Sequence, residues 1–399
     1  MSLLPVDDAL EIILKAAPAP YRTEAVPLER AAGRTLAEAL SAARTQPPAD
    51  VSAMDGYAVA PGDQEPGTTL ALIGESAAGA GFSGKVVRGT AVRIFTGAPI
   101  PEGAGCVVMQ EDVSRSDDRI TIVRPSSSRN IRAAGGDFSK GDVLLEPGTR
   151  LSARHIALAA AAGFPELSVW QKPRIAILMT GDELVPPGCE PGPGQIVAAN
   201  GYGIAAMAQD AGASIIANQI VPDDMAALRE ALVTARNAAD LVVTIGGASV
   251  GDRDLVRPAL EAEGFSLALH KIAMRPGKPL MFGRDRDTLL LGLPGNPVSA
   301  LVTGLVFLVP LIAFMAGYCR RPLVLPRQTT LPLPANSDRR HYMRAVLGED
   351  GTVTPLGDQD SSLLTVLARA GALIIREPGA PGICAGSPVE TLIFDPSQL

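Results

Sequence analysis

The sequence predicts a multidomain protein of the α/β plus β class, centred on a doubly wound parallel-sheet domain. From residue 172 to about 322, short apolar runs alternate with helical patterns, which is typical of a parallel sheet covered by helices on both faces. Residues 50–141 and 323–399 instead contain short β-like runs between Gly, Pro and Ser clusters. Hydrophobic residues make up 47% of the 399, which is enough to bury several cores and excludes global disorder.

The segments that flank residues 50–141 are predicted to be helical. Apolar residues recur at helical spacing within 6–14, and a second helical pattern covers about 151–163. We expect the flanking segments, 1–49 and 142–171, to form one discontinuous helical linker domain. The first helix is acidic where a secretory leader would be basic, so we expect it to remain on the protein.

The β-rich domain at 50–141 precedes the parallel domain and differs from it in sequence pattern, because its short apolar runs do not alternate with helices. Its strands are predicted at four short runs, 70–73, 91–95, 106–109 and 120–123. The segment 323–399 has the same pattern of short strands and turns and is predicted to form either a small β-barrel or a sandwich.

Strands of the parallel domain, residues 172–322, are predicted at five apolar runs, 174–179, 215–221, 241–245, 267–273 and 289–293. Residues 288–319 carry no charge and are long enough to resemble a membrane span. The turn Leu-Gly-Leu-Pro-Gly-Asn-Pro and the later Pro310 interrupt this stretch. We therefore predict a buried strand, a tight turn and a buried helix, and no membrane.

Net charge and cysteine content exclude several classes of partner and site. The chain has 42 acidic and 35 basic residues, a net charge of -7, and only 4% aromatic residues. Nucleic acid is therefore excluded as the principal partner, because its binders need a basic surface and stacking side chains. The four cysteines are widely spaced, which argues against a zinc site or a disulfide framework and favours a cytoplasmic protein.

Glycine-rich turns follow several strands of the parallel domain, where such sheets bind ligands. Gly246 and Gly247, followed by Ser249, are suited to surround a phosphate with backbone N–H groups. A turn that merely precedes a helix would have the same sequence. Acidic residues at two of these strand ends favour the phosphate-binding interpretation.

Those acidic residues are Asp182, Glu183, Asp252 and Asp254. Clustered carboxylates repel one another unless a cation lies among them, which predicts Mg²⁺ bound with a phosphate-bearing ligand. Helix capping is the alternative for any one of them.

Basic residues and two loops complete the candidate site. Lys271, Arg275 and Lys278 lie within eight residues and are suited to bind phosphate or another oxyanion. Asp55 and Thr96, each beside a glycine in the β-rich domain, are either ligand-binding or turn-forming residues.

Six ordered motifs resemble the signature of the MoeA family of molybdopterin molybdenumtransferases, which includes the E domain of gephyrin. They lie at 52–59 (Ser-Ala-Met-Asp-Gly-Tyr-Ala-Val), 96–101 (Thr-Gly-Ala-Pro-Ile-Pro), 180–184 (Thr-Gly-Asp-Glu-Leu), 246–252, 271–279 and 292–300. The resemblance covers nearly the whole chain.

The resemblance implies four domains, with a MogA-like parallel domain that binds molybdopterin and a C-terminal β-barrel domain. It implies a homodimer in which the β-rich domain of one subunit completes the active site of the other. The substrates would be adenylylated molybdopterin and molybdate, with Mg²⁺ as cofactor and AMP released. A molybdopterin adenylyltransferase would be a partner that delivers the substrate.

By motif position, the resemblance implies a role for each of sixteen residues. Catalytic roles fall to Asp55, Thr96, Glu183 and Asp254, and the metal ligands would be Glu183 and Asp254. Substrate contacts, together with the phosphate turn above, fall to Asp137, Asp223, Gly246, Gly247, Ser249, Lys271, Arg275, Lys278, Pro294, Pro297, Arg344 and Ser361. Asp55, Thr96 and Asp137 would come from the partner's β-rich domain. Asp224 beside Asp223, and Ser362 beside Ser361, are alternatives at two positions.

The chain departs from the usual family sequence at four positions. Gly136 replaces a glutamate, Ala199 a serine and Asp360 a glycine, and Ala248 changes the Gly-Gly-Val-Ser motif. We expect these changes to alter ligand affinity more than the type of reaction.

Two other functions stay open on the sequence. One is molybdopterin adenylyltransferase, whose members share the parallel domain but lack the motifs at 52–59 and 96–101. The other is a non-catalytic pterin-binding scaffold.

Overall fold

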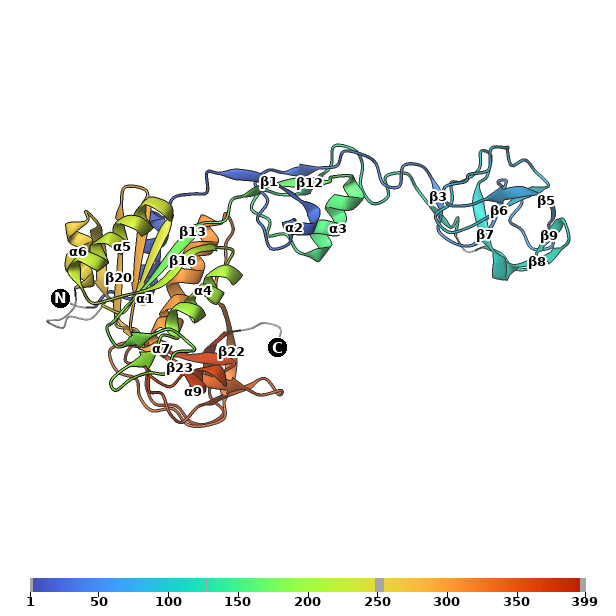
Figure 1. The fold of residues 1–399 in the computed structure, drawn as a ribbon. Coiled ribbons are helices and arrows are strands. Elements are labelled where there is room, and N and C mark those ends of the chain that lie inside the picture. Colours follow the sequence, from blue (N-terminus) through green and yellow to red (C-terminus); the bar gives the residue numbers. More distant parts are fainter. Residues whose placement is uncertain (1–2, 127, 248–254, 395–399) are drawn as a thin grey trace. The chain divides into compact units, whose positions relative to one another are not determined.

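The computed structural model describes residues 3–126, 128–247 and 255–394, which divide into two compact units (Figure 1). Unit 1 contains the chain up to Glu24, Gly33–Ala37, and the chain from Ser168 onward. Unit 2 contains Ala25–Ala32 and Glu38–Leu167. Each unit is described by itself.

Unit 1 is built on a six-stranded sheet with the order β16-β13-β17-β21-β20-β18. The strands are β13 (Arg174–Thr180), β16 (Ser214–Val221), β17 (Leu241–Ile245), β18 (Ser266–Lys271), β20 (Pro279–Asp285) and β21 (Thr288–Leu293). The four strands β16, β13, β17 and β21 are parallel. β20 is antiparallel to both of its neighbours, β21 and β18, so the edge strand β18 has the same direction as the four parallel strands.

The sheet differs from the sequence analysis in β20, which was not predicted and which separates the expected strand at 267–273, observed as β18, from β21. The reason is the length of the connections. Seven residues, 272–278, join β18 to β20, and Arg286 and Asp287 join β20 to β21. A parallel pair needs a crossover of a dozen or more residues, so these links permit only antiparallel pairing.

Helices cover both faces of the sheet, as expected for a doubly wound domain. One face packs against α4 (Asn200–Asp210) and the long helical stretch after β21, within a single core cluster. The other face packs against α5 (Met225–Ala238) and α6 (Val256–Ala262). Strands β13, β17 and β21 are therefore apolar on both faces and almost entirely buried.

The charge-free stretch forms a buried strand and helix, as predicted. After β21 the chain turns and enters α7 (Pro297–Thr303), a π-helical turn (Gly304–Leu308) and α8 (Val309–Met315). This helix has the length and composition of a membrane span, but 83% of its most apolar window is buried inside the unit. Gly304 permits close contact with α4, because a Cβ there would lie 2.8 Å from Ile204 Cδ1.

Helix α1 (Val6–Ala16) also packs in unit 1, although we expected residues 1–49 in the linker domain. Val6, Ala9 and Ile13 are buried in the same core cluster as the sheet and α8. The apolar stripe of this helix finds a large apolar partner there. Asp7 accepts two hydrogen bonds from Arg340, at 2.7 and 2.8 Å, which links α1 to the C-terminal region.

The C-terminal region is a closed five-stranded β-barrel, so the barrel is the correct alternative. Its strands are β22 (Leu323–Thr329), β23 (Arg340–Leu347), β24 (Thr352–Pro355), β25 (Ala372–Arg376) and β26 (Pro388–Ile393). They pair in the order β23-β24-β22-β26-β25, and β25 returns to β23. The short strand β19 (Met274–Arg275) adds to β23, and α9 (Leu364–Ala368) lies between β24 and β25.

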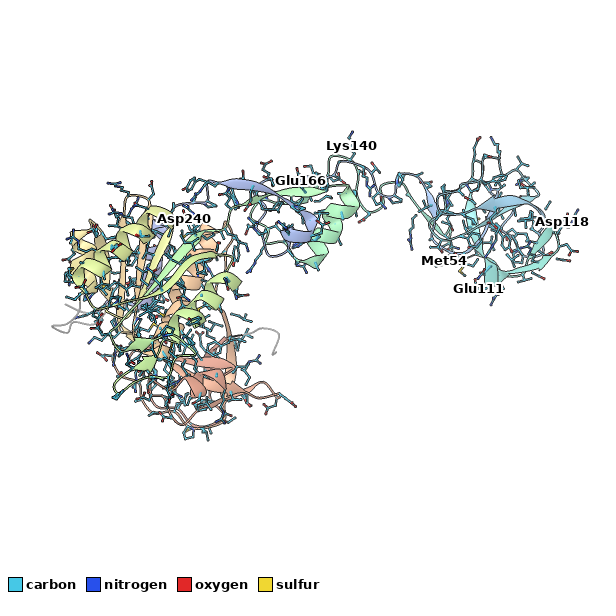
Figure 2. The ribbon with its side chains drawn as sticks, in the orientation of Figure 1. Met54, Glu111, Asp118, Lys140, Glu166 and Asp240 are labelled. Carbon is cyan, nitrogen blue, oxygen red and sulfur yellow. The ribbon has the colours of Figure 1, made fainter. Side chains whose placement is uncertain are left out.

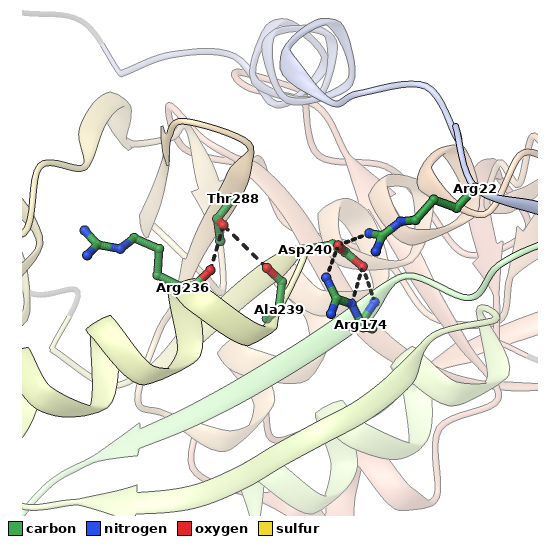
Figure 3. Close-up of polar contacts among 6 residues, drawn as sticks. All are labelled: Arg22, Arg174, Arg236, Ala239, Asp240 and Thr288. Atoms are coloured by element: carbon green, nitrogen blue, oxygen red, sulfur yellow. Dashed lines mark hydrogen bonds and ion pairs between the residues drawn. The ribbon is translucent and has the colours of Figure 1, made fainter.

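An ion cluster joins the amino ends of the parallel strands (Figure 3). Asp240, directly before β17, accepts hydrogen bonds from Arg174 at the start of β13 and from Arg22. Thr288, at the start of β21, donates to the carbonyl oxygens of Arg236 and Ala239. These contacts are structural and occupy the edge of the sheet where its parallel strands begin.

Unit 2 contains a six-stranded sheet with the order β7-β4-β6-β5-β9-β8. The strands are β4 (Gly56–Val59), β5 (Thr69–Ser76), β6 (Thr90–Ile94), β7 (Cys106–Met109), β8 (Val113–Ser116) and β9 (Arg119–Ile122). Apolar clusters cover both faces of this sheet. Met54 lies in the loop before β4 and is 43% exposed (Figure 2).

The rest of unit 2 is less helical than expected. Its helices are α2 (Leu28–Ala31) and α3 (Ala153–Ala162), and short strands replace helix elsewhere. In the segments expected to be helical, β2 (Leu40–Ser41) pairs with β11 (Val143–Leu145). Within the β-rich segment 50–141, β3 (Val51–Ser52) pairs with β10 (Ile131–Arg132). Strands β1 (Thr23–Pro27) and β12 (Glu166–Trp170), which also pair, carry the chain between the units.

Candidate functional site

A pocket of about 840 Å³ lies in unit 1 at the carboxyl ends of β13, β17 and β21. Its walls are the turns after these strands, the start of α4, and two residues of the C-terminal region, Ser362 and Leu364. Ligand binding at the carboxyl ends of strands is the general property of such sheets. This pocket is therefore the candidate active site of unit 1.

The turn after β17 brings backbone to the pocket wall. Gly246 and Gly247 both line the pocket and have positive φ angles of 94° and 60°. A Cβ on Gly246 would lie 2.8 Å from the carbonyl oxygen of Thr180. Only glycine fits this close approach of β13 and β17, so the main chain itself faces the pocket.

Two acidic side chains line the pocket, Glu183 after β13 and Asp223 after β16. Asp182 also lies close, because its carboxylate accepts a hydrogen bond of 2.9 Å from the Asp223 N–H. Partial burial raises the pKa of Asp223, and the charges of Asp182 and Glu183 raise it further. Negative charge is thus concentrated on one side of the pocket.

The structure also separates Asp223 from Asp224. Asp224 is the N-cap of α5 and accepts a hydrogen bond of 2.9 Å from the Ala227 N–H. Asp223 lines the pocket, so it is the residue of this pair that fits the predicted substrate contact.

Among the described residues, no three His, Cys, Asp or Glu side chains are arranged to hold a metal ion. Asp254, the second predicted metal ligand, and Ser249 of the predicted phosphate turn lie outside the described residues. Mg²⁺ typically takes only one or two protein carboxylates and fills its shell with water and substrate phosphate oxygens. Glu183 and Asp223 fit that donor set.

None of the three predicted basic residues lines the pocket. Lys271 ends β18, Arg275 lies on β19, and Lys278 is adjacent to Pro279, which does line the pocket. The loop is closed by a 3.0 Å hydrogen bond from the Ile272 N–H to the Lys278 carbonyl.

Arg275 belongs to a charged environment at the barrel. It pairs with His341 across β19 and β23. Burial, with the charges of Arg275, Arg344 and Arg339, lowers the pKa of His341 to about 4. His341 is thus neutral at physiological pH, and the arginines provide the positive charge of this region.

The turn after β21 contributes Pro294 and Pro297, both of which line the pocket as predicted. Two pocket asparagines that the sequence analysis missed hold this turn. Asn200 Nδ2 donates to the Gly295 carbonyl oxygen at 2.7 Å, and Asn296 Nδ2 donates to Ser361 Oγ at 3.0 Å. Asn296 has a sequence signal, because it lies between Gly295 and Pro297 in the turn after a buried strand, whereas Asn200 begins α4.

Arg344 is placed differently from its predicted substrate contact. Its side chain is 1% exposed and does not line the pocket. Its Nη1 donates to the Asp360 carbonyl oxygen at 2.7 Å and its Nε donates to Gln359 Oε1 at 3.2 Å. The guanidinium therefore holds the loop that carries Ser361 and Ser362.

The two serines of this loop have different surroundings. The Ser361 carbonyl oxygen accepts a 3.0 Å hydrogen bond from the Val298 N–H at the start of α7, and its hydroxyl accepts from Asn296. Ser361 therefore joins the barrel to the turn after β21. Ser362, the alternative, lines the pocket.

Unit 2 has a pocket of about 760 Å³, and one of its three predicted site residues, Asp137, lines it. Gly97 also lines it. Next to Gly97, Thr96 donates to Asp55 Oδ1 from its N–H at 2.7 Å and from its hydroxyl at 2.9 Å. These hydrogen bonds lower the pKa of Asp55, which is exposed and ionised at neutral pH.

Comparison with known proteins assigns the chain to a family. Residues 4–163 match the MoeA N-terminal region (domains I and II), residues 176–313 a probable molybdopterin binding domain, and residues 327–394 the MoeA C-terminal region (domain IV). A molybdopterin molybdenumtransferase of Haemophilus influenzae is 36% identical, over 99% of this chain and 98% of the relative. The chain belongs to the MoeA family.

Other MoeA-family proteins agree with this assignment. A molybdopterin molybdenumtransferase of Nostoc sp. is 36% identical over 97% of this chain and 93% of its own. The solved structure of a molybdopterin biosynthesis MoeA protein from Pyrococcus horikoshii is 30% identical, has a TM-score of 0.83, and covers 99% of this chain and all of that one. Another structure of MoeA from that organism has a TM-score of 0.86 at 28% identity.

In this MoeA-family chain, the pocket of unit 1 gathers six of the predicted residues. They are Glu183, Asp223, Gly246, Gly247, Pro294 and Pro297. Of the three basic residues, Lys278 precedes the lining residue Pro279, and Arg344 and Ser361 act on the pocket wall through other residues.

Proposed function

We propose that this MoeA-family chain inserts molybdenum into molybdopterin by using adenylylated molybdopterin and molybdate and releasing AMP. The chain is a transferase of molybdenum cofactor biosynthesis by family. The observation that carries the finer proposal is the pocket in which exposed backbone at Gly246 and Gly247 faces Glu183 and Asp223. Such a site suits a ligand with several phosphate groups and a cation.

The proposed reaction breaks one bond of the pyrophosphate group in the substrate. An oxygen of water or molybdate attacks phosphorus, the bridging P–O bond breaks, and AMP leaves. The backbone N–H groups of the turn after β17 would bind phosphate oxygens. Lys271, Arg275 and Lys278 would hold the second oxyanion at the border of the pocket.

We propose Mg²⁺ as the cofactor, held by Glu183, Asp223 and, by family resemblance, Asp254. Burial and the nearby charges of Asp182 and Glu183 raise the pKa of Asp223, and a divalent cation bound here would relieve the repulsion between these carboxylates. When bound, Mg²⁺ would neutralise phosphate charge and stabilise the leaving group.

AMP release from adenylylated molybdopterin tests the reaction, with and without molybdate and Mg²⁺. We expect release that requires both ions and falls at least about a hundredfold in Glu183→Ala, since removal of a ligand that stabilises developing charge has that effect. Glu190→Ala is the matched control, because Glu190 is exposed in the same segment and does not line the pocket. Consumption of ATP with free molybdopterin would instead support an adenylyltransferase, and binding without turnover a scaffold.

We also propose a cytoplasmic homodimer in which Asp55, Thr96 and Asp137 of one subunit complete the site of the other. The pocket of unit 2 supports this proposal, because Asp137 lines it and Thr96, which is hydrogen-bonded to Asp55, precedes the lining residue Gly97. A molybdopterin adenylyltransferase would deliver the substrate.

Mixing two inactive variants tests the homodimer. In a homodimer of either variant, Glu183→Ala or Asp55→Ala, both sites lack one of the two residues. In a mixed dimer, one of the two sites has both residues. Random re-assembly should therefore restore about a quarter of the wild-type activity. No restoration after confirmed subunit exchange would contradict the shared site.

A further inference from the structure

A loop of the C-terminal region forms part of the pocket wall in unit 1. Ser362 and Leu364 line the pocket opposite the turns of the parallel sheet. The loop runs from β24 to α9 and contains Asp358 and Asp360. Its polar groups therefore decide which ligand atoms this wall accepts.

The hydroxyl of Ser362 is already engaged by Asp360. Ser362 Oγ donates to Asp360 Oδ1 at 2.6 Å, and the Ser362 N–H donates to the same oxygen at 2.8 Å. A hydroxyl has one hydrogen and two acceptor lone pairs. Ser362 can therefore accept a hydrogen bond from a ligand, but its hydrogen is not available to donate to one.

Asp360 is itself fixed by its neighbours. Its N–H donates to Asp358 Oδ1 at 2.9 Å, and its carbonyl oxygen accepts from Arg344 Nη1 at 2.7 Å. The hydrogen bonds from Ser362, with a smaller effect from Arg344, lower the pKa of Asp360, so it is ionised at neutral pH. With Asp358 beside it, the loop carries two negative charges against the one positive charge of buried Arg344.

An oxyanion meets two obstacles at this wall. The oxygens of molybdate and of a pyrophosphate diester carry negative charge at neutral pH and accept hydrogen bonds, so they need donors and positive charge around them. Asp360 removes the Ser362 donor and adds a negative charge. We propose that Asp360 is a specificity-determining residue, which weakens oxyanion binding at the barrel wall and leaves Ser362 to accept from an N–H group of the ligand.

This inference rests on the proposed function, because it takes molybdate as a ligand of the pocket. The test is titration of the full-length protein with sodium molybdate by isothermal calorimetry. Asp360→Asn keeps the acceptor oxygen for Ser362 and removes only the charge, so we expect molybdate to bind about threefold more tightly. Asp360→Ala also frees the Ser362 hydroxyl, and we expect a gain of about tenfold, because a hydrogen bond to an anion is added.

Changes at Ser362 separate the two effects. Ser362→Ala alone should leave molybdate affinity unchanged, because the wild-type hydroxyl does not donate to it. The double variant Asp360→Ala with Ser362→Ala should match Asp360→Asn. Both lack the negative charge at 360, and neither has a Ser362 hydroxyl that is free to donate to molybdate. This cycle tests the coupling of the two residues directly.

Asp350 provides the matched control. On the same barrel, its Oδ1 accepts from the Thr352 N–H at 3.1 Å and from the Thr352 hydroxyl at 2.6 Å, and it does not line the pocket. Asp350→Asn therefore removes a charge from the same local arrangement and should leave molybdate affinity as in wild type.

The outcomes are distinct. Equal affinities in wild type, Asp360→Asn and Asp360→Ala would overturn the inference, as would a large loss in Ser362→Ala. AMP release by the wild-type protein is measured in parallel. Normal release with equal affinities would overturn the inference alone, whereas ordered gains without release would overturn the proposed reaction alone. Absence of molybdate binding in every variant would overturn both.

Discussion

Asn296, in the turn after β21, donates its side-chain amide to the hydroxyl of Ser361, 65 residues later in the chain, at 3.0 Å. The bond connects the parallel-sheet domain to the barrel at the rim of the pocket. Through it, a turn that carries two pocket prolines is fixed to the loop that carries Ser362.

Removal of this amide should impair turnover without unfolding the protein. We expect Asn296→Ala to lower kcat/KM for AMP release about tenfold, because the barrel loop loses its fixed position at the wall. The melting temperature should change by less than about 2 °C, since Asn296 is exposed and contributes one hydrogen bond. Asn237→Ala, at an exposed position of α5, is the control, and wild-type kinetics in both variants would contradict the linking role.

Substitution of Gly246 should be costly for two reasons. Its φ of 94° is unfavourable for other residues, and a Cβ would lie 2.8 Å from the Thr180 carbonyl oxygen. We expect Gly246→Ala to lower the free energy of unfolding by about 2 kcal/mol or more and to abolish AMP release.

Gly188→Ala separates the cost of a positive φ angle from the cost of a steric clash. Gly188 has a φ of 92°, but no atom lies within 4 Å of its added Cβ. This variant should lose only about 1 kcal/mol in urea denaturation and keep its activity. Equal losses in both variants would mean that the contact with Thr180 has no effect.

Asp223 and Asp224 provide a matched pair for the acidic site. Asp223→Asn should weaken Mg²⁺ activation of AMP release at least about tenfold, because a charged oxygen ligand is lost. Asp224→Asn should leave activation unchanged, since asparagine is an equally good N-cap for α5. Magnesium titrations of both variants decide the matter, and the reverse ranking would reassign the pocket residue.

The ion cluster at Asp240 predicts a pH dependence of stability. Burial raises the pKa of Asp240, but hydrogen bonds and charge from Arg174, with the charge of Arg22, lower it overall. A lowered folded-state pKa gives a contribution that is complete above the unfolded value of about 4 and is lost as the pH falls through the folded value.

Asp240→Asn should therefore lower the free energy of unfolding by about 1 kcal/mol at pH 7 and have a much smaller effect near pH 2. Urea denaturation at both pH values measures the difference, with Glu230→Gln, exposed on α5, as the control. A loss of the same size at both pH values would show that the charge of Asp240 is not its source.

Local sequence pattern predicted the strands that are buried on both faces. Runs such as 174–179 and 241–245 are continuously apolar because helices cover both sides of them. Such a run can be recognised from the local sequence alone, without knowing which strands lie next to it. β20 was missed because glycine, arginine and proline interrupt its pattern, and its direction depends on the short links to β18 and β21.

The candidate site divides in the same way. Glu183 and Gly246 follow predicted strands, so the position of a strand end was enough to identify them. Arg344 and Ser361 act through partners that only the folded chain reveals, namely the Asp360 carbonyl and the Asn296 amide. A motif marks such residues as important but cannot tell contact with a ligand from support of a neighbour.

The location of α1 has a consequence for how the protein is made. Its buried residues Val6, Ala9 and Ile13 belong to one core with β21 and α8, which leave the ribosome nearly 300 residues later. All of unit 2 is synthesised in between and can fold as a unit of its own. The apolar stripe of α1 therefore lacks these core partners until the chain has been translated as far as α8.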